Sequence, residues 1–169
     1  GVVTGDYNND GFPDVFVSNF GLNQFFINQG DGTFTEQAES VGVAGTHRVG
    51  AGACFLDIDG DGLLDLYAAS YIRFDYPAHR TRTINGHLFH SGPNDSPPAP
   101  DYLYWNAGDG TYGDISESSG IRAQVSPGMG VLSADFNGDG LPDIFVANDQ
   151  HGNFMLTNRG NRRFEFEEL

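Results

Sequence analysis

A short acidic motif occurs three times in this 169-residue chain, and it constrains the fold more than any other feature. Each copy reads D-x-[DN]-x-D-G-x-x-D, and the copies begin at Asp6, Asp57 and Asp135. A short run rich in β-branched and aromatic residues follows each copy, which predicts a strand directly after the motif. A motif that recurs with the same flanking pattern indicates that one structural unit is repeated along the chain.

Each motif is followed, further along the chain, by a pattern that predicts a β-hairpin. Its turn carries Gly-Asp-Gly at 30–32 and 108–110, and Gly-Asn-Arg at 160–162. Asp-Gly between apolar runs is a strong short-range hairpin signal. Small, Gly-rich segments precede the motifs, clearly at 50–56 and 128–134 and as a stub at 1–4. Each unit therefore predicts four short strands.

Four antiparallel strands per repeat are typical of the blade of a β-propeller. We therefore expect an all-β chain of three four-stranded antiparallel β-propeller blades, at residues 1–48, 49–127 and 128–169. Propellers have about 4–8 blades, so three blades form part of a larger propeller or of one completed by other copies. The second unit carries an insertion over 71–100 with no strand period, and we expect it to be ordered and to pack on a protein surface, its own or a partner's.

The acidic motifs suggest calcium. A carboxylate at every second position of a tight loop points several oxygens at one centre, and Ca²⁺ takes about 6–8 oxygen ligands. We predict about three bound Ca²⁺ ions, each held by four side chains and one backbone carbonyl. The predicted ligands are Asp6, Asn8, Asp10, the Phe12 carbonyl and Asp14; Asp57, Asp59, Asp61, the Leu63 carbonyl and Asp65; and Asp135, Asn137, Asp139, the Leu141 carbonyl and Asp143.

Two other interpretations of the motif are weaker. Asp-Gly and Asn-Gly are ordinary turn formers, but ten carboxylates in three loops would repel one another without a counter-ion. An EF-hand begins with the same letters and needs a bidentate Glu at its twelfth position; here that position holds Val17, Ala68 and Val146. The motif therefore leads into a strand and not into a helix. Gly62 is expected to allow the sharp reversal, where a Cβ would clash.

The three loops and their flanking strands resemble FG-GAP/VCBS repeats, the blades of integrin α-subunit propellers. The resemblance is closer to secreted ASPIC/UnbV-type proteins, which are cartilage acidic protein-like. It lies in Gly92-Pro93, in Ala99-Pro100-Asp101-Tyr-Leu-Tyr-Trp-Asn106-Ala-Gly-Asp-Gly-Thr111, and in the segment from Gly128 to Asp149. That family often has a Cys before its Gly-Pro, where this chain has Ser91. The resemblance implies an extracellular binding or adhesion module without established catalysis.

Charge and composition limit the partners. The chain has 23 acidic and 8 basic residues, a net charge of −15, and no Lys. No basic stripe exists for nucleic acid, and no long apolar run exists for membrane insertion. We expect a calcium-binding extracellular propeller module, secreted, on the cell surface or in the periplasm, which is not an enzyme and binds a protein or a glycan. The alternative is a structural subunit that binds copies of itself and assembles into a ring or filament.

Several other residues carry weaker signals. His79, His87 and His90 lie in the insertion, where His87 and His90 could share a transition metal, although exposed loop histidines are the more common case. Cys54 lies in a Gly-rich strand and is expected to fill space. The sequon at Asn94 is followed, after Ser96, by Pro97, which weakens it as a glycosylation site. Paired carboxylates for glycoside hydrolysis are better explained as calcium ligands.

Overall fold

The computed structural model describes residues 1–77, 81–90, 92 and 95–169. Its strands are all antiparallel to their neighbours, and the only α-helix among the described residues is the four-residue α1 (Ala38–Val41). The all-β expectation is confirmed. No helix in the described part is long and apolar enough to cross a membrane. Ser91, His79 and Asn94 lie outside the described residues.

Three larger sheets account for most of the described chain, and each contains one acidic loop. Sheet 1 has the order β1 (Val2–Gly5), β2 (Asp14–Val17), β4 (Gln24–Asn28) and β5 (Phe34–Glu36). Sheet 2 has the order β11 (Tyr112–Asp114), β10 (Tyr102–Asn106), β7 (Asp65–Ser70), β6 (Arg48–Leu56) and β3 (Phe20–Gly21). Sheet 3 has the order β12 (Gly128–Ala134), β13 (Asp143–Asn148), β14 (Phe154–Asn158) and β15 (Phe164–Glu168).

Each sheet contains the Gly-rich strand, the strand after the acidic loop and the two strands of the hairpin, in that order. The predicted strand order within a unit is thus observed. Sheet 2 gains one more strand, because Phe20 of β3 pairs with Val49 of β6. This pairing joins the segment 1–48 to the segment 49–127, and no local sequence signal indicates it.

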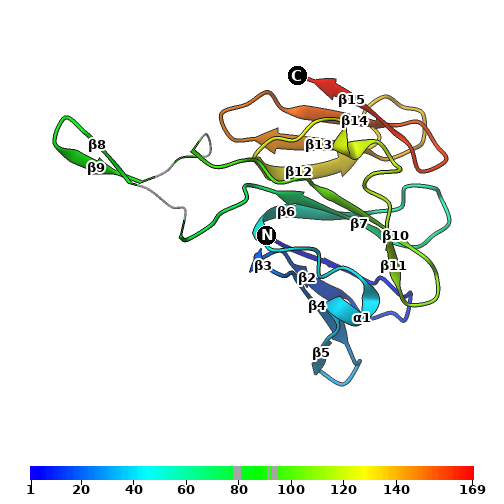
Figure 1. The fold of residues 1–169 in the computed structure, drawn as a ribbon. Coiled ribbons are helices and arrows are strands. Elements are labelled where there is room, and N and C mark those ends of the chain that lie inside the picture. The colour runs from blue at the N-terminus through cyan, green and yellow to red at the C-terminus, as the bar shows by residue number, and fades with distance from the viewer. Residues whose placement is uncertain (78–80, 91, 93–94) are drawn as a thin grey trace.

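The three sheets stack, with sheet 2 between the other two (Figure 1). Alternation along β7 sends successive side chains to opposite faces of the sheet. Leu66 packs in the core shared with sheet 1, and Tyr67 in the core shared with sheet 3; both are fully buried. Only one face of sheet 1 and one face of sheet 3 take part in these two cores.

The Gly-rich composition of the first strand in each unit follows from close packing between sheets. β6 lies against both β1 and β12. A Cβ added to Gly52 would lie 2.8 Å from the Met129 carbonyl oxygen, a distance that no packed side chain tolerates. A small residue is therefore required where these strands approach each other.

The insertion contains regular structure, so the prediction that it lacks strands was wrong. β8 (Arg82–Ile84) and β9 (His87–Phe89) form a two-stranded hairpin that projects away from the three sheets (Figure 1). Its two-residue turn is Asn85-Gly86, with φ of 51° and 81°. Asn-Gly is the strongest two-residue hairpin signal, and it was present in the sequence. The start of the insertion packs on sheet 2, where the rings of Phe74 and Tyr76 contact Phe20.

Candidate metal centres

The second acidic loop is wound by hydrogen bonds from its own backbone to Asp57. One carboxylate oxygen of Asp57 accepts the amides of Gly60 at 2.8 Å and Asp61 at 3.1 Å, and the other accepts the amide of Gly62 at 2.9 Å. Asp61 accepts the amide of Leu63 at 2.8 Å. The first Asp therefore fixes the loop, and the loop in turn positions the later carboxylates.

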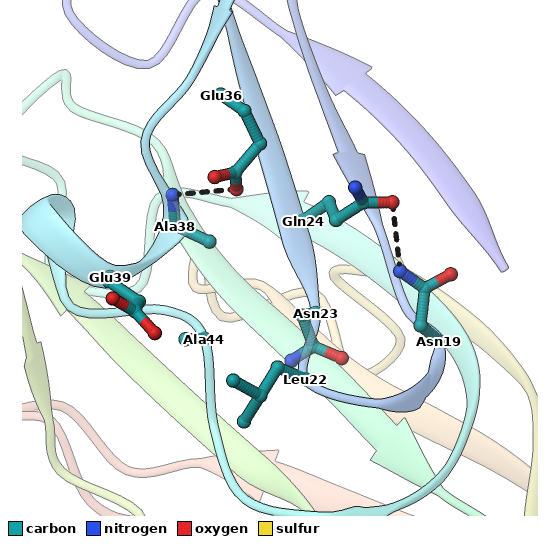
Figure 2. A pocket seen from close by; sticks show the side chains of 8 residues that line it. All are labelled: Asn19, Leu22, Asn23, Gln24, Glu36, Ala38, Glu39 and Ala44. Atoms are coloured by element: carbon teal, nitrogen blue, oxygen red, sulfur yellow. Dashed lines mark hydrogen bonds between the residues drawn. The ribbon is translucent and has the colours of Figure 1, made fainter.

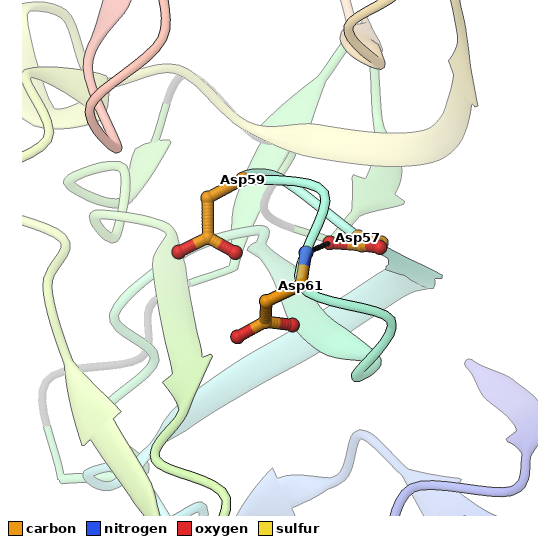
Figure 3. Close-up of side chains that lie close together, drawn as sticks. All are labelled: Asp57, Asp59 and Asp61. Carbon is orange, nitrogen blue, oxygen red and sulfur yellow. Dashed lines mark hydrogen bonds between the residues drawn. The ribbon is translucent and has the colours of Figure 1, made fainter.

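The structure brings three of the four predicted carboxylates of this loop together. Asp57, Asp59 and Asp61 each place an oxygen within 4.8 Å of the other two (Figure 3). One oxygen of Asp59 is buried and has no hydrogen-bond partner. A converging set of hard oxygens with one orphaned member fits a hard cation, so this cluster could hold a metal ion. Asp65 is not part of the cluster.

The first and third loops repeat the same backbone pattern with one carboxylate fewer. Asp135 accepts backbone amides from the residues three, four and five positions further along, as Asp57 does, and Asp6 accepts those from the fourth and fifth. Asn8 donates its side-chain amide to Asp10 at 2.9 Å, and Asn137 donates to Asp139 at 2.9 Å. The backbone bonds hold the pKa of the Asp135 carboxyl below its usual range. Loops one and three thus offer two carboxylates and an amide at the corresponding positions.

The glycines of the loops are required by backbone conformation and not by crowding, contrary to the expected clash. Gly62 has φ of +84° and Gly140 of +87°. A Cβ on either would meet no atom within 4 Å. The left-handed conformation alone therefore favours glycine at this position.

The last Asp of each motif has a structural role that sequence reasoning missed. Asp14, Asp65 and Asp143 are buried, with exposed fractions of 0%, 1% and 1%. In each, one oxygen accepts an amide of its own loop, and the other accepts the amide of the Asn that ends the next hairpin strand, at 2.8 Å. The last Asp therefore joins the loop to its hairpin, and its role as a ligand stays a prediction. Burial, reinforced by Asp59 and Asp61, raises the pKa of Asp65 to about 7.

Arg162 also reaches the second loop, although it lies 103 residues away in the sequence. Its Nε donates to Asp59 at 2.7 Å, and its guanidinium lies 3.6 Å from the centre of the Trp105 ring. Asp59 is the residue that makes this loop richer in carboxylates than the other two. The arginine thus balances the additional charge from the neighbouring sheet.

The other sequence candidates gain no site. His87 and His90 are exposed and belong to no group of three or more metal-binding side chains in the described part of the chain. Burial raises the pKa of the Cys54 thiol to about 12, which agrees with a packing role.

A cavity of about 430 Å³ between α1 and sheet 1 is lined by Glu36, Glu39 and Asn19 among others (Figure 2). In it Glu36 accepts the amide of Ala38, and Asn19 donates to Gln24.

Comparison with known proteins identifies these loop-bearing units. The sequence pattern of the FG-GAP-like repeat matches residues 6–68, 91–146 and 135–168. The chain belongs to the FG-GAP-like repeat family. Among curated relatives, cartilage acidic protein 1 of Xenopus tropicalis is 41% identical over 77 residues, which cover 44% of this chain and 12% of that protein. Cartilage acidic protein 1 of Homo sapiens is 43% identical over 54 residues, covering 32% of this chain and 8% of that protein.

The chain thus spans about an eighth or less of the relatives it matches, and the predicted resemblance to this group is confirmed. Among solved structures, a lectin of Agrocybe aegerita that recognises non-reducing terminal N-acetylglucosamine superposes with a TM-score of 0.51. The identity is 15%, and the match covers 99% of this chain and 37% of the lectin chain. At this identity the lectin supports the propeller-like fold alone.

Proposed function

We propose that this FG-GAP-like chain is a calcium-stabilised, non-catalytic extracellular binding module. The observation that carries the proposal is the convergence of Asp57, Asp59 and Asp61 with an orphaned oxygen on Asp59. The same loop backbone recurs at Asp6 and Asp135, so we propose one ion per loop. The complete ligand sets are those predicted from the motif, including one backbone carbonyl in each loop.

Calcium is the proposed metal because the donors are hard oxygens that converge in a tightly wound loop. Mg²⁺ demands near-octahedral geometry and sheds water reluctantly, whereas Ca²⁺ accepts irregular sets of protein oxygens. The affinity is expected to be modest, about 10⁻⁴–10⁻³ M, as in extracellular modules. Loops of that affinity would fill where calcium is abundant, so we propose that the protein acts outside the cytoplasm: secreted, on the cell surface or in the periplasm.

The partner is proposed to be a glycan or a protein. The lectin that shares this fold recognises a terminal sugar, which makes glycans the first class to test by array binding with and without calcium. We further propose that residues 1–48, 49–127 and 128–169 are successive blades, each with one calcium loop.

Calorimetric titration of the folded chain with CaCl₂ and MgCl₂ tests the metal. We expect calcium uptake by the parent and loss of the second-loop ion in Asp61→Ala, because the central carboxylate is removed. Asp59→Asn is the matched control, since it gives the second loop the Asn that the first and third loops already have at that position. No calcium uptake by the folded parent, or an unchanged number of bound ions in Asp61→Ala, would refute the proposed site.

A second candidate function is self-assembly, and the outer face of sheet 3 favours it. Leu132 and Phe136 are 57% and 45% exposed. They occupy the positions of the repeat that correspond to Cys54 and Ile58, which pack between sheets 2 and 3. The exposed face of sheet 3 thus has apolar side chains at the positions that, in sheet 2, pack on a neighbouring sheet. Light scattering tests this candidate: we expect oligomers that Leu132→Glu dissociates, and a monomeric parent would exclude it.

A further inference from the structure

A cavity of about 330 Å³ lies where the start of β6, the beginning and end of the insertion and the 3-10 helix η2 (Ile121–Ala123) meet. Three of its lining residues are Arg48, Arg73 and Arg122. The whole chain has eight basic residues against 23 acidic ones. More than a third of its positive charge therefore lines one small cavity, whose remaining lining residues are Thr46, His47, Ala99, Pro100 and Tyr102.

Arg48 is the central residue of this cavity. Its exposed fraction is 2%, and burial lowers the pKa of its guanidinium. Nη1 donates to the Thr46 carbonyl at 3.4 Å, whereas Nε and Nη2 have no hydrogen-bond partner among the described residues. The guanidinium lies 3.9 Å from the centre of the Tyr102 ring. A buried cation with unpaired donors is costly unless a ligand or solvent satisfies them.

The other two arginines are also incompletely paired. Arg122 lies 5.0 Å from the centre of the Tyr102 ring, donates through Nε to the Asp101 carbonyl at 3.3 Å, and comes only within 3.7 Å of the Asp114 carboxylate. Arg73 is exposed at the rim and forms no ion pair within the described part of the chain. Both guanidinium groups retain donors that can face an incoming anion.

The nearest buried carboxylate does not complete the site. Both oxygens of Asp101 already accept hydrogen bonds, one from the Tyr67 hydroxyl and one from the Ser70 amide at 2.7 Å. Asp101 forms no ion pair within 4 Å with Arg48 among the residues the structure describes. The Asp101 carboxylate therefore attracts Arg48 and Arg122 at longer range and does not satisfy their remaining donors.

We propose that this pocket, the arginine pocket, binds an oxyanion group: sulfate or carboxylate, either as a free anion or as part of an acidic sugar. Arginine forks match the planar or tetrahedral oxygens of such groups, and a volume of about 330 Å³ accommodates one monosaccharide-sized ligand. The cavity in Figure 2 offers a contrast, since Glu36 and Glu39 line it and no arginine does. The proposal does not rest on calcium binding by the acidic loops.

Calorimetry of the full chain at low ionic strength tests the arginine pocket, with sodium sulfate and methyl glucuronide as the two probes. We expect the parent to bind at least one probe. Arg73→Gln, at the exposed rim, should weaken binding about fivefold or more, because a charge-assisted hydrogen bond is lost, and Arg48→Gln should weaken it further. Sulfate binding alone would point to a free anion or a sulfate ester, and glucuronide binding to an acidic sugar; either supports the site.

Arg163→Gln is the control, because Arg163 is exposed and does not line the pocket, while the substitution removes the same charge. We expect the affinity of the Arg163→Gln variant for the probe to stay within about twofold of that of the parent. Should Arg48→Gln fail to fold, Arg73→Gln and the rise in Tm of the parent with added probe still decide the question. The absence of binding for both probes, or equal weakening in Arg163→Gln, would overturn the proposal.

Discussion

Arg162 occupies a backbone conformation that favours glycine. Its φ is 59°, whereas the hairpins of sheets 1 and 2 have Gly32 and Gly110 at the corresponding position, with φ of 89° and 86°. A left-handed arginine costs conformational energy that glycine would not. The contacts of Arg162 with Asp59 and with the Trp105 ring, across the interface between sheets 2 and 3, offset this cost. Arg162 therefore acts as a built-in counter-ion for the most acidic loop.

Arg162→Gln is expected to raise the calcium affinity of the second loop. In the parent, Ca²⁺ approaches a cluster whose charge is already partly balanced by the arginine, and removal of that cation strengthens the attraction. The calcium-free protein should become less stable, because the carboxylates lose their partner. Calorimetry and chemical denaturation in chelator measure the two effects. Arg163→Gln should change neither, and a lower calcium affinity in Arg162→Gln would contradict the counter-ion role.

Asp101 is expected to make the stability of the folded state depend on pH. Burial raises the pKa of its carboxyl to about 6, against hydrogen bonds from Tyr67 and Ser70 and the attraction of Arg48 and Arg122. An exposed aspartate has a pKa of about 3.9. Between these values the folded state binds more protons than the unfolded state. The contribution of Asp101 to stability is therefore greatest below about pH 4 and is lost as the pH rises through about 6.

Asp101→Asn should remove this dependence. Relative to the parent, the variant should gain stability as the pH rises from 4 to 7, by up to about 3 kcal/mol at about 1.4 kcal/mol per pKa unit. Urea denaturation of both proteins across this range measures the difference, and titration of the acidic loops cancels because it is common to both. A difference that is constant with pH would contradict the raised pKa.

At the scale of elements, the Asn that ends each hairpin strand joins one sheet to the next. Asn106 donates to the Tyr7 carbonyl at 2.8 Å, and Asn158 donates to the Ile58 carbonyl at 2.9 Å. Both carbonyls belong to the acidic loop of the preceding sheet. The side-chain amide of Asn28 donates instead to the Pro13 carbonyl, within its own sheet, at 3.1 Å. The same residue type thus carries a bond between sheets at two of its three positions.

Asn158→Ala should destabilise the fold more than Asn28→Ala does. Both lose a bond within the sheet, and only Asn158→Ala also leaves the buried Ile58 carbonyl without its donor. The unsatisfied carbonyl adds about 1–3 kcal/mol to the loss of unfolding free energy. Equilibrium unfolding in urea of the two variants and the parent gives the comparison. Equal losses would show that the bond between the sheets contributes nothing measurable.

For the whole molecule, the proposed calcium ions and the stacking of the sheets are linked. The acidic loops supply the carbonyls of Tyr7 and Ile58 to the neighbouring sheets, so a metal that fixes the loops also fixes the interfaces. Chelator should lower the Tm of the parent by mass action and should lower it much less in a variant with Asp10, Asp61 and Asp139 all replaced by Ala. Scanning calorimetry measures both, and equal sensitivity to chelator would exclude a structural role for the metal.

The repeated unit was readable from the sequence because its determinants are local. The nine-residue motif, the Asp-Gly turn and the short apolar runs act over a few residues, and they predicted the loops, the strand order within each unit and the all-β class. The β8–β9 hairpin is equally local, because its Asn85-Gly86 turn is a two-residue hairpin signal in the sequence. The need for glycine at position 62 was also predicted, although the reason is the φ of Gly62 and not a clash.

Only the tertiary structure decided how the units act on one another. Local spacing does not show that Arg162 meets Asp59, that Phe20 extends the sheet of the following unit, or that Arg48 is buried beside two other arginines. These contacts join residues far apart in the chain. They form because the sheets bury their apolar faces when they stack, which brings polar side chains of different sheets into contact. The sequence by itself determined what each repeat is, and the packing of the repeats determined which charges are paired and which are not.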